Sequence, residues 1–180
     1  MMKNVRRAAV LVQNALIEVQ NMAPIKLAND EVEVAISRVG VCSSDIERGF
    51  NDGAYNYPLV MGHEIAGTIS TIASGECSFD IGQRVAIFPL LPCFMCASCK
   101  AKKYALCRDY SYYGSRRNGG FATHLSVRCW NLMKLPDQVS MDDAALVEPT
   151  AVVIHAIRKL RLSPDSRQVC VIGAGFLGLL

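Results

Sequence analysis

The sequence of 180 residues has no apolar run long enough to cross a membrane as a helix, no internal repeat and no low-complexity segment. It also lacks a basic stripe, because its 19 Lys and Arg are spread along the chain and the net charge is only +3. These absences argue against a membrane or a nucleic acid as the partner. The apolar share of 51% is enough for a sizeable core, so we expect a folded chain.

A secretory signal is also lacking. The N-terminus starts with basic residues and continues into an apolar run, but Gln13, Asn14 and Glu18 interrupt that run early, and no small-residue cleavage site follows. We therefore expect a cytoplasmic protein. In that compartment eight cysteines are more typical of metal ligands, buried apolar residues or reactive thiols than of disulfides.

Short strand-like segments, separated by Gly and Pro, dominate the first 127 residues. Many such strands favour a barrel or a sandwich. Residues 43–50 are the exception and predict a short helix with a Ser or Asp cap. The strand-like segments are residues 8–13, 15–20, 31–41, 64–73, 83–91 and 119–127.

The pattern changes near Met141. Residues 141–160 have helical spacing, with Pro149 at a break or a helix start. An apolar strand is then expected before Gly173-x-Gly175-x-x-Gly178, which is the arrangement of a dinucleotide-binding turn. The acidic residue expected about twenty positions further on would lie beyond Leu180, so we expect a piece of a longer protein.

Four cysteines, Cys93, Cys96, Cys99 and Cys107, have the spacing C-x2-C-x2-C-x7-C. Four thiolates in one loop can surround a Zn²⁺ ion tetrahedrally and leave no ligand position for a substrate, so a structural zinc site is predicted. An iron–sulfur cluster and four unrelated buried cysteines are the alternatives.

A second group is scattered along the chain. Cys42, His63 and Glu148 could supply the three protein ligands of a catalytic zinc with an open position, which would lower the pKa of a bound alcohol. Glu64 is a candidate for an exchangeable fourth ligand, and Ser44 for a proton carrier. Taken singly, a cysteine or histidine of this kind is more often an ordinary core residue.

These signals, in this order, resemble the zinc-dependent medium-chain alcohol and polyol dehydrogenases over nearly the whole chain. The segment GVCSSD around Cys42 is similar to the family's G-x-C-x-S-D, with Ser43 where Gly is common, and GHE at residues 62–64 matches the second ligand motif. The cysteine loop lacks the usual glycine before its first cysteine. Glu148-Pro149 resembles the polyol branch, which uses Glu in place of a second catalytic cysteine.

Within that branch, YPLVMGHEIAG, FPLLPCFMC and YGSRRNGGFA resemble the galactitol-1-phosphate 5-dehydrogenase family, which oxidises a hexitol phosphate with NAD⁺. Sorbitol, xylitol and threonine dehydrogenases share the metal motifs and are alternatives. Arg116 and Arg117 are then candidates for binding a substrate phosphate, against the alternative of a solvated loop or a salt bridge. For Tyr110, Tyr112 and Tyr113 we favour packing beneath the zinc loop over a place in the cleft.

The resemblance implies a mainly β fold with some α: a GroES-like barrel over 1–148, then a linking helix and the start of an NAD(P)-binding Rossmann domain over 149–180. It implies catalytic and structural zinc, NAD or NADP, a small alcohol, polyol or polyol phosphate as substrate, and a homo-oligomer for the full-length protein. We expect little dehydrogenase activity from these 180 residues alone. Two other hypotheses are a zinc-braced binding module and a zinc-free quinone reductase on the same fold.

Overall fold

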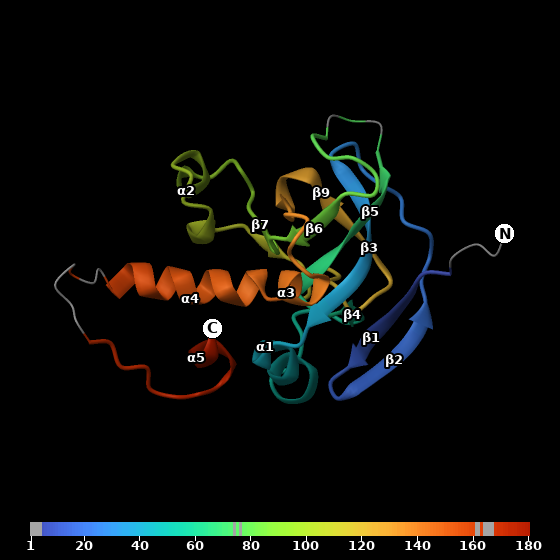
Figure 1. The fold of residues 1–180 in the computed structure, drawn as a ribbon. Coiled ribbons are helices and arrows are strands. Elements are labelled where there is room, and N and C mark those ends of the chain that lie inside the picture. The colour runs from blue at the N-terminus through green and yellow to red at the C-terminus, as the bar shows by residue number, and fades with distance from the viewer. Residues whose placement is uncertain (1–4, 74, 76, 161–162, 164–167) are drawn as a thin grey trace.

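A computed structural model describes residues 5–73, 75, 77–160, 163 and 168–180 (Figure 1). The described part is mainly β with some α, as predicted. Its strands are β1 (Arg7–Gln13), β2 (Leu16–Asn21), β3 (Glu31–Gly40), β4 (Leu59–Val60), β5 (Glu64–Ile72), β6 (Arg84–Ile87), β7 (Leu90–Leu91), β8 (Ser111–Tyr112), β9 (His124–Arg128) and β10 (Leu132–Lys134).

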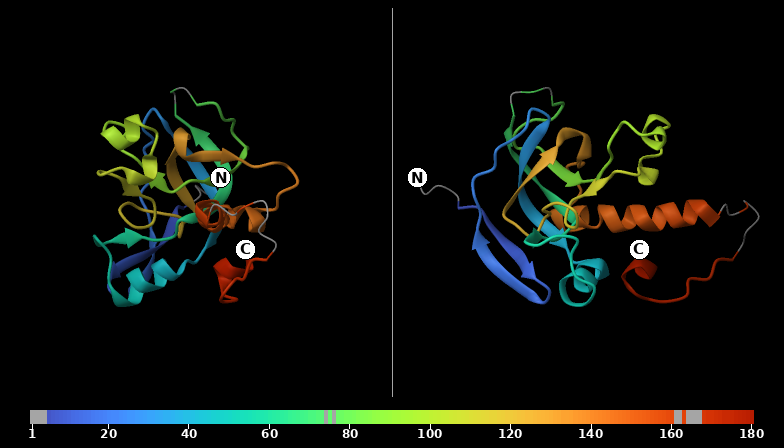
Figure 2. Two further views of the ribbon diagram at one scale, coloured as in Figure 1. Left: turned by 90° about the vertical axis from the view of Figure 1, so that its left-hand side faces the viewer. Right: turned by 180° about the vertical axis from the view of Figure 1, so that it is seen from behind.

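Three antiparallel sheets surround the core. The largest has the order β10-β6-β5-β3-β9, the second has the order β2-β1-β4, and β7 pairs with β8. Residues 119–123 join the first two sheets, because the backbone N–H of Ala9 donates to the carbonyl of Phe121 and that of Ile36 donates to the carbonyl of Thr123. This segment therefore links the two sheets, which lie next to each other in both views of Figure 2.

The core follows from the two-residue period of β3 and β5. Val32 and Val34 of β3 are fully buried, and Ile65 and Ile69 of β5 are 1% exposed, so alternate side chains of both strands point inward. The two strands pair antiparallel along most of their length, with Gly40 opposite Glu64 at one end. The end of β3 and the start of β5 therefore lie side by side at one end of the barrel.

Short helices and one long helix complete the chain. The long helix extends away from the sheets, and the C-terminal segment returns alongside it (Figures 1 and 2). No helix of the described residues is long and apolar enough to cross a membrane. The helices are α1 (Ser43–Ile46), the π-helical turn η1 (Glu47–Asn51), α2 (Ala97–Lys100), the 3-10 turns η2 (Tyr104–Leu106) and η3 (Cys129–Asn131), α3 (Met141–Ala145), α4 (Val147–Leu160) and α5 (Phe176–Leu179).

Several predicted boundaries are wrong. Residues 83–91 form two strands that belong to different sheets, since β6 pairs with β5 and β10 while β7 pairs with β8, and the strand expected after the Gly119-Gly120 turn begins at His124. The residue before α1 is Cys42, and the cap comes from Asp45 in the first turn, whose side chain accepts the backbone N–H of Cys42. Residues 168–172 form no strand, and a strand needs a neighbour for its backbone hydrogen bonds, which none of the described residues supplies. Pro149 lies in the first turn of α4, as predicted.

The expectation of no disulfides is wrong for one pair. Cys77 and Cys129 form a disulfide between residues 52 positions apart, with a Cα–Cα distance of 5.9 Å. Cys77 follows β5 and Cys129 follows β9, and both side chains pack against the same end of the core. Sequence spacing carries no signal for this pair, because the fold alone brings the two loops together.

Candidate active site

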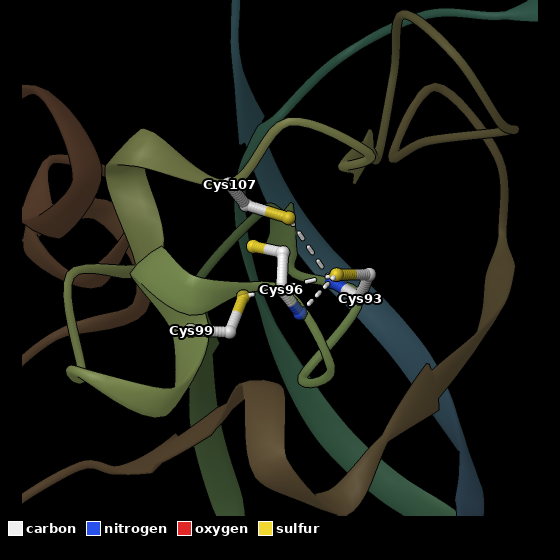
Figure 3. Close-up of side chains that lie close together, drawn as sticks. All are labelled: Cys93, Cys96, Cys99 and Cys107. Carbon is white, nitrogen blue, oxygen red and sulfur yellow. Dashed lines mark hydrogen bonds between the residues drawn. The ribbon is translucent and has the colours of Figure 1, made fainter.

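The four predicted structural ligands meet in one lobe (Figure 3). The sulfurs of Cys93, Cys96, Cys99 and Cys107 all lie within 4.8 Å of one another. Phe94 has a φ of +60°, an uncommon conformation for a residue with a side chain, and this turn brings Cys93 and Cys96 together. Four sulfur donors at this spacing fit a tetrahedral Zn²⁺ ion.

Backbone N–H groups in the lobe favour thiolates. The backbone N–H of Cys93 donates to the sulfur of Cys107 at 3.3 Å, and the backbone N–H of Cys96 donates to the sulfur of Cys93 at 3.4 Å. N–H groups of Cys99 and Arg108 lower the pKa of Cys96 to about 6. Because the thiolate is the form that binds metal, these N–H groups favour a cation at Cys96, whereas burial holds the pKa of Cys99 well above its usual value.

Aromatic side chains hold the outside of this lobe. Trp130 packs edge-on against Phe94 and Tyr104, with ring centroids 5.1 and 5.3 Å away, and against Phe88 at 5.7 Å. This cluster was not predicted from the sequence. Trp130 lies in η3 next to Cys129, so the lobe is packed against the turn that carries the disulfide.

The second site lies where β3 and β5 meet. Cys42 follows the end of β3 and His63 precedes β5, so the pairing of Gly40 with Glu64 brings the two motifs together. Ligand atoms of Cys42, His63 and Glu64 lie within 4.8 Å of one another, and His63 and Glu64 are buried. A thiol, an imidazole and a carboxylate are the donors that zinc accepts in proteins.

The buried Asp45 supports this site from behind. Its Oδ1 lies 3.5 Å from Nδ1 of His63 and 3.5 Å from the guanidinium of Arg48. Its other oxygen accepts the backbone N–H of Cys42 at 3.1 Å, and Oδ1 accepts that of Gly62 at 3.3 Å. Asp45 therefore both caps α1 and orients His63.

Local charges tune two of the candidate ligands. Burial lowers the pKa of His63, but the hydrogen bond and charge of Asp45 offset this and raise it to about 9. Burial raises the pKa of Cys42, yet hydrogen bonds from Ser44 and His63 leave it below its ordinary value. A thiol that ionises easily, beside an imidazole fixed by a carboxylate, suits a metal site.

The carboxyl groups of Glu64 and Glu148 differ in how close they lie to Cys42 and His63. Burial, together with the charges of Glu148 and Asp45, raises the pKa of Glu64. Glu148 lies outside the cluster formed by Cys42, His63 and Glu64, and its Oε1 accepts a hydrogen bond from the Tyr112 hydroxyl at 3.2 Å. It nevertheless lines the same pocket as those three residues. Glu64 is thus the oxygen donor nearer to Cys42 and His63, and Glu148 lines the pocket outside that cluster.

The glycine motif lines that same pocket. Gly173, Gly175 and Gly178 border a cavity of about 660 Å³ together with Cys42, His63, Glu64 and Glu148. Gly173 has a φ of +104°, and a side chain at Gly178 would lie 2.2 Å from the Gly173 carbonyl oxygen. The backbone at this turn therefore requires glycine, and the predicted cofactor motif lies beside the predicted metal site.

The remaining candidates divide between two places. Ser44 and Arg116 line a smaller pocket beside His63, with Tyr110 and Tyr112. Packing beneath the zinc loop is therefore wrong for these two tyrosines. Arg117 and Tyr113 lie elsewhere: the guanidinium of Arg117 lies over the ring of Tyr113, which is fully buried in the core, and within 3.5 Å of Glu31.

The chain is similar to known proteins over most of its length. The family described as "Alcohol dehydrogenase GroES-like domain" matches residues 28–137. Galactitol 1-phosphate 5-dehydrogenase of Escherichia coli K12 is 42% identical over 151 residues, which are 84% of this chain and 43% of that protein. Sorbitol dehydrogenase of Bacillus subtilis strain 168 is 33% identical over 179 residues, 97% of this chain and 50% of that protein.

The fold is also similar to that of a solved structure. The crystal structure of galactitol-1-phosphate dehydrogenase from Escherichia coli superposes with a TM-score of 0.89 at 37% identity, covering 96% of this chain and 50% of that one. The chain thus spans about half the length of the curated relatives it matches.

Proposed function

Because the chain belongs to the family of zinc-dependent medium-chain alcohol and polyol dehydrogenases that carry the GroES-like domain, we propose that it forms the metal-binding half of such an enzyme. The reaction would move a hydride between an alcohol or polyol and NAD(P). The observation that carries the proposal is the shared pocket, in which Cys42, His63 and Glu64 face the glycine turn at Gly173–Gly178.

We assign the catalytic zinc to Cys42 and His63, with carboxylate donors from Glu64 and Glu148. Zinc bound there would act as a Lewis acid and favour loss of the substrate's hydroxyl proton. Asp45 holds the His63 ring so that its other nitrogen faces the pocket. Ser44 lines the adjoining pocket beside His63 and is our candidate for passing the hydroxyl proton toward solvent.

The glycine turn would hold the dinucleotide. Its lack of side chains lets a pyrophosphate approach the backbone closely, and its place across from His63 would bring the nicotinamide toward the substrate carbon. The domain division that goes with this proposal is a catalytic domain over 1–148 and the beginning of an NAD(P)-binding domain over 149–180. The four-cysteine lobe would hold a structural zinc without taking part in the reaction.

For the substrate, we propose a hexitol phosphate such as galactitol 1-phosphate, the compound named in the relative that is 42% identical. A neutral polyol is the alternative, as in the sorbitol dehydrogenase of Bacillus subtilis. We further propose a cytoplasmic protein that is a homo-oligomer at full length and binds neither nucleic acid nor membrane. In a reducing cytoplasm Cys77 and Cys129 would be two thiols, so a disulfide found between them in protein from its native source would contradict this location.

Zinc content tests the two-site proposal directly. We expect about two zinc ions per purified chain, about one in Cys42→Ser, and about one in Cys93→Ser, because each variant removes a ligand from a different cluster. Elemental analysis measures this. Cys170→Ser is the matched control, since Cys170 is an exposed free cysteine outside both clusters, and it should keep both ions. Two ions in Cys42→Ser would rule out the catalytic site.

A further inference from the structure

Arg116 is held in place by two aromatic rings. Its guanidinium lies 4.5 Å from the ring centre of Tyr55 and 4.6 Å from that of Tyr110. One of its nitrogens also donates to the Tyr110 hydroxyl at 3.4 Å. Ring stacking uses the faces of the guanidinium plane and leaves donors on its edge for another ligand.

The neighbouring arginines already have carboxylate partners. Arg117 lies 3.5 Å from Glu31, and Arg48 lies 3.5 Å from Asp45. Among the described residues no carboxylate lies within ion-pair distance of Arg116. Arg116 is therefore a positioned cation whose partner is not supplied by the described part of the chain.

The place of Arg116 indicates what that partner is. It lines a pocket of about 250 Å³ with Arg48, Ser44 and His63, so the pocket connects two guanidinium groups with a metal-ligand candidate and the proposed proton carrier. A small molecule in this pocket would meet the metal site at one end and positive charge at the other. Its polar lining also suits a hydroxylated chain between the two ends.

Resting on the proposed function, we propose that Arg116 determines substrate specificity by binding an anionic group at the far end of the polyol, namely a phosphate monoester. Arg48 lines the same pocket, but its charge is paired with Asp45, so the unpaired positive charge of the pocket comes from Arg116. A phosphate has three terminal oxygens and can accept two hydrogen bonds from one guanidinium edge. A sugar acid would place a smaller carboxylate at the same position.

Calorimetric titration of the zinc-loaded chain tests this inference through binding. The ligands are galactitol 1-phosphate, unphosphorylated galactitol and the aldonate galactonate. We expect the phosphate to bind at least about tenfold more tightly than galactitol, and Arg116→Gln to remove about tenfold or more of that preference, because a charge-assisted hydrogen bond is lost. Affinity for galactitol should fall by much less than affinity for the phosphate, because galactitol lacks the anionic group.

Arg117→Gln is the matched control, because it removes the same charge from the adjacent residue, whose guanidinium lies over Tyr113 instead. It should keep the preference for phosphate. The inference is overturned if the unsubstituted chain shows no such preference, if Arg116→Gln keeps it, or if galactonate binds more tightly than the phosphate ester. Thermal unfolding of each variant shows whether the fold is retained.

The two proposals fail in different ways. Two zinc ions together with equal binding of galactitol and its phosphate would overturn the role of Arg116 and leave the dehydrogenase proposal standing. If the unsubstituted chain binds no zinc through Cys42 but still prefers the phosphate, and this preference depends on Arg116, the dehydrogenase proposal is overturned and the anion site is supported.

Discussion

At the residue scale, the carboxylate of Asp45 contacts four parts of the candidate site. These are the imidazole of His63, the backbone N–H groups of Cys42 and Gly62, and the guanidinium of Arg48. Asp45 is only 1% exposed, so its charge acts in a medium that screens it poorly. The raised pKa of His63, about 9, follows chiefly from this neighbour.

That pKa predicts how zinc binding depends on pH. Zinc needs the neutral imidazole, so below about pH 9 metal must displace a proton from His63, and affinity at this site should rise with pH up to that point. Asp45→Asn removes the charge that holds the proton. We expect the zinc affinity of this variant to level off at a lower pH. Competition with a chelator across roughly pH 6–9, the range between the ordinary pKa of histidine and the raised pKa of His63, would measure this.

The same pair affects the stability of the metal-free chain. A folded-state pKa above the ordinary value of 6.5 means that the contribution of His63 is fully present below about pH 6.5 and is lost as pH rises through about 9. Asp137→Asn, which changes an exposed carboxylate outside the site, should keep the pH dependence of the unsubstituted chain. An identical profile for Asp45→Asn would contradict this account.

At the scale of secondary-structure elements, β3 and β5 decide where the ligands lie. Their antiparallel register brings the residues after β3 beside those before β5. Close backbone approach along this pair depends on Gly67, where a side chain would lie 2.4 Å from the Ala35 carbonyl oxygen. Gly40 has a different role, since a side chain there would lie 1.9 Å from the carboxylate oxygen of Glu64, so this glycine leaves room for a candidate ligand.

Gly67→Val should therefore disturb both stability and metal binding. The added side chain must push β3 away, so we expect a loss of about 1–3 kcal/mol in the free energy of unfolding, with less zinc at the Cys42 site. Chemical denaturation and elemental analysis would measure the two effects. Thr68→Val, a swap of similar volume at the next position, should cost less. Equal losses in both variants would show that the close approach is unimportant.

At the scale of the whole molecule, the Cys77–Cys129 disulfide ties together two loops that are distant in sequence. It closes a separation of 52 residues and lies next to the aromatic cluster that packs on the cysteine lobe. A covalent link of this length reduces the freedom of the unfolded chain more than that of the folded chain. It should therefore stabilise the barrel without supplying a ligand to either metal site.

Replacing both cysteines by serine should lower the free energy of unfolding by about 2–4 kcal/mol, as is typical for loss of a native disulfide. Denaturant titration of the double variant would measure this, and its zinc content should remain at about two ions. Treatment of the unsubstituted chain with a reductant is the parallel control. A double variant as stable as the oxidised chain would show that the link contributes nothing.

The sequence by itself determined what is local. Four cysteines within fifteen residues predicted one cluster, alternating residues predicted β3 and β5, and the glycine spacing predicted the tight turn near Gly173, because each of these depends on neighbours along the chain. The choice of Cys42, His63 and Glu148 came from family resemblance. Single scattered residues carry no spacing signal of their own.

The tertiary structure decided everything that depends on contacts between distant segments. Strand register brought Cys42 to His63 and made Glu64 the nearer carboxylate, while Glu148 faces Tyr112. Folding also joined Cys77 to Cys129 and placed Arg116 between two tyrosines. Such contacts arise from how sheets close around a core, and residues far apart in sequence carry no local pattern that reveals them.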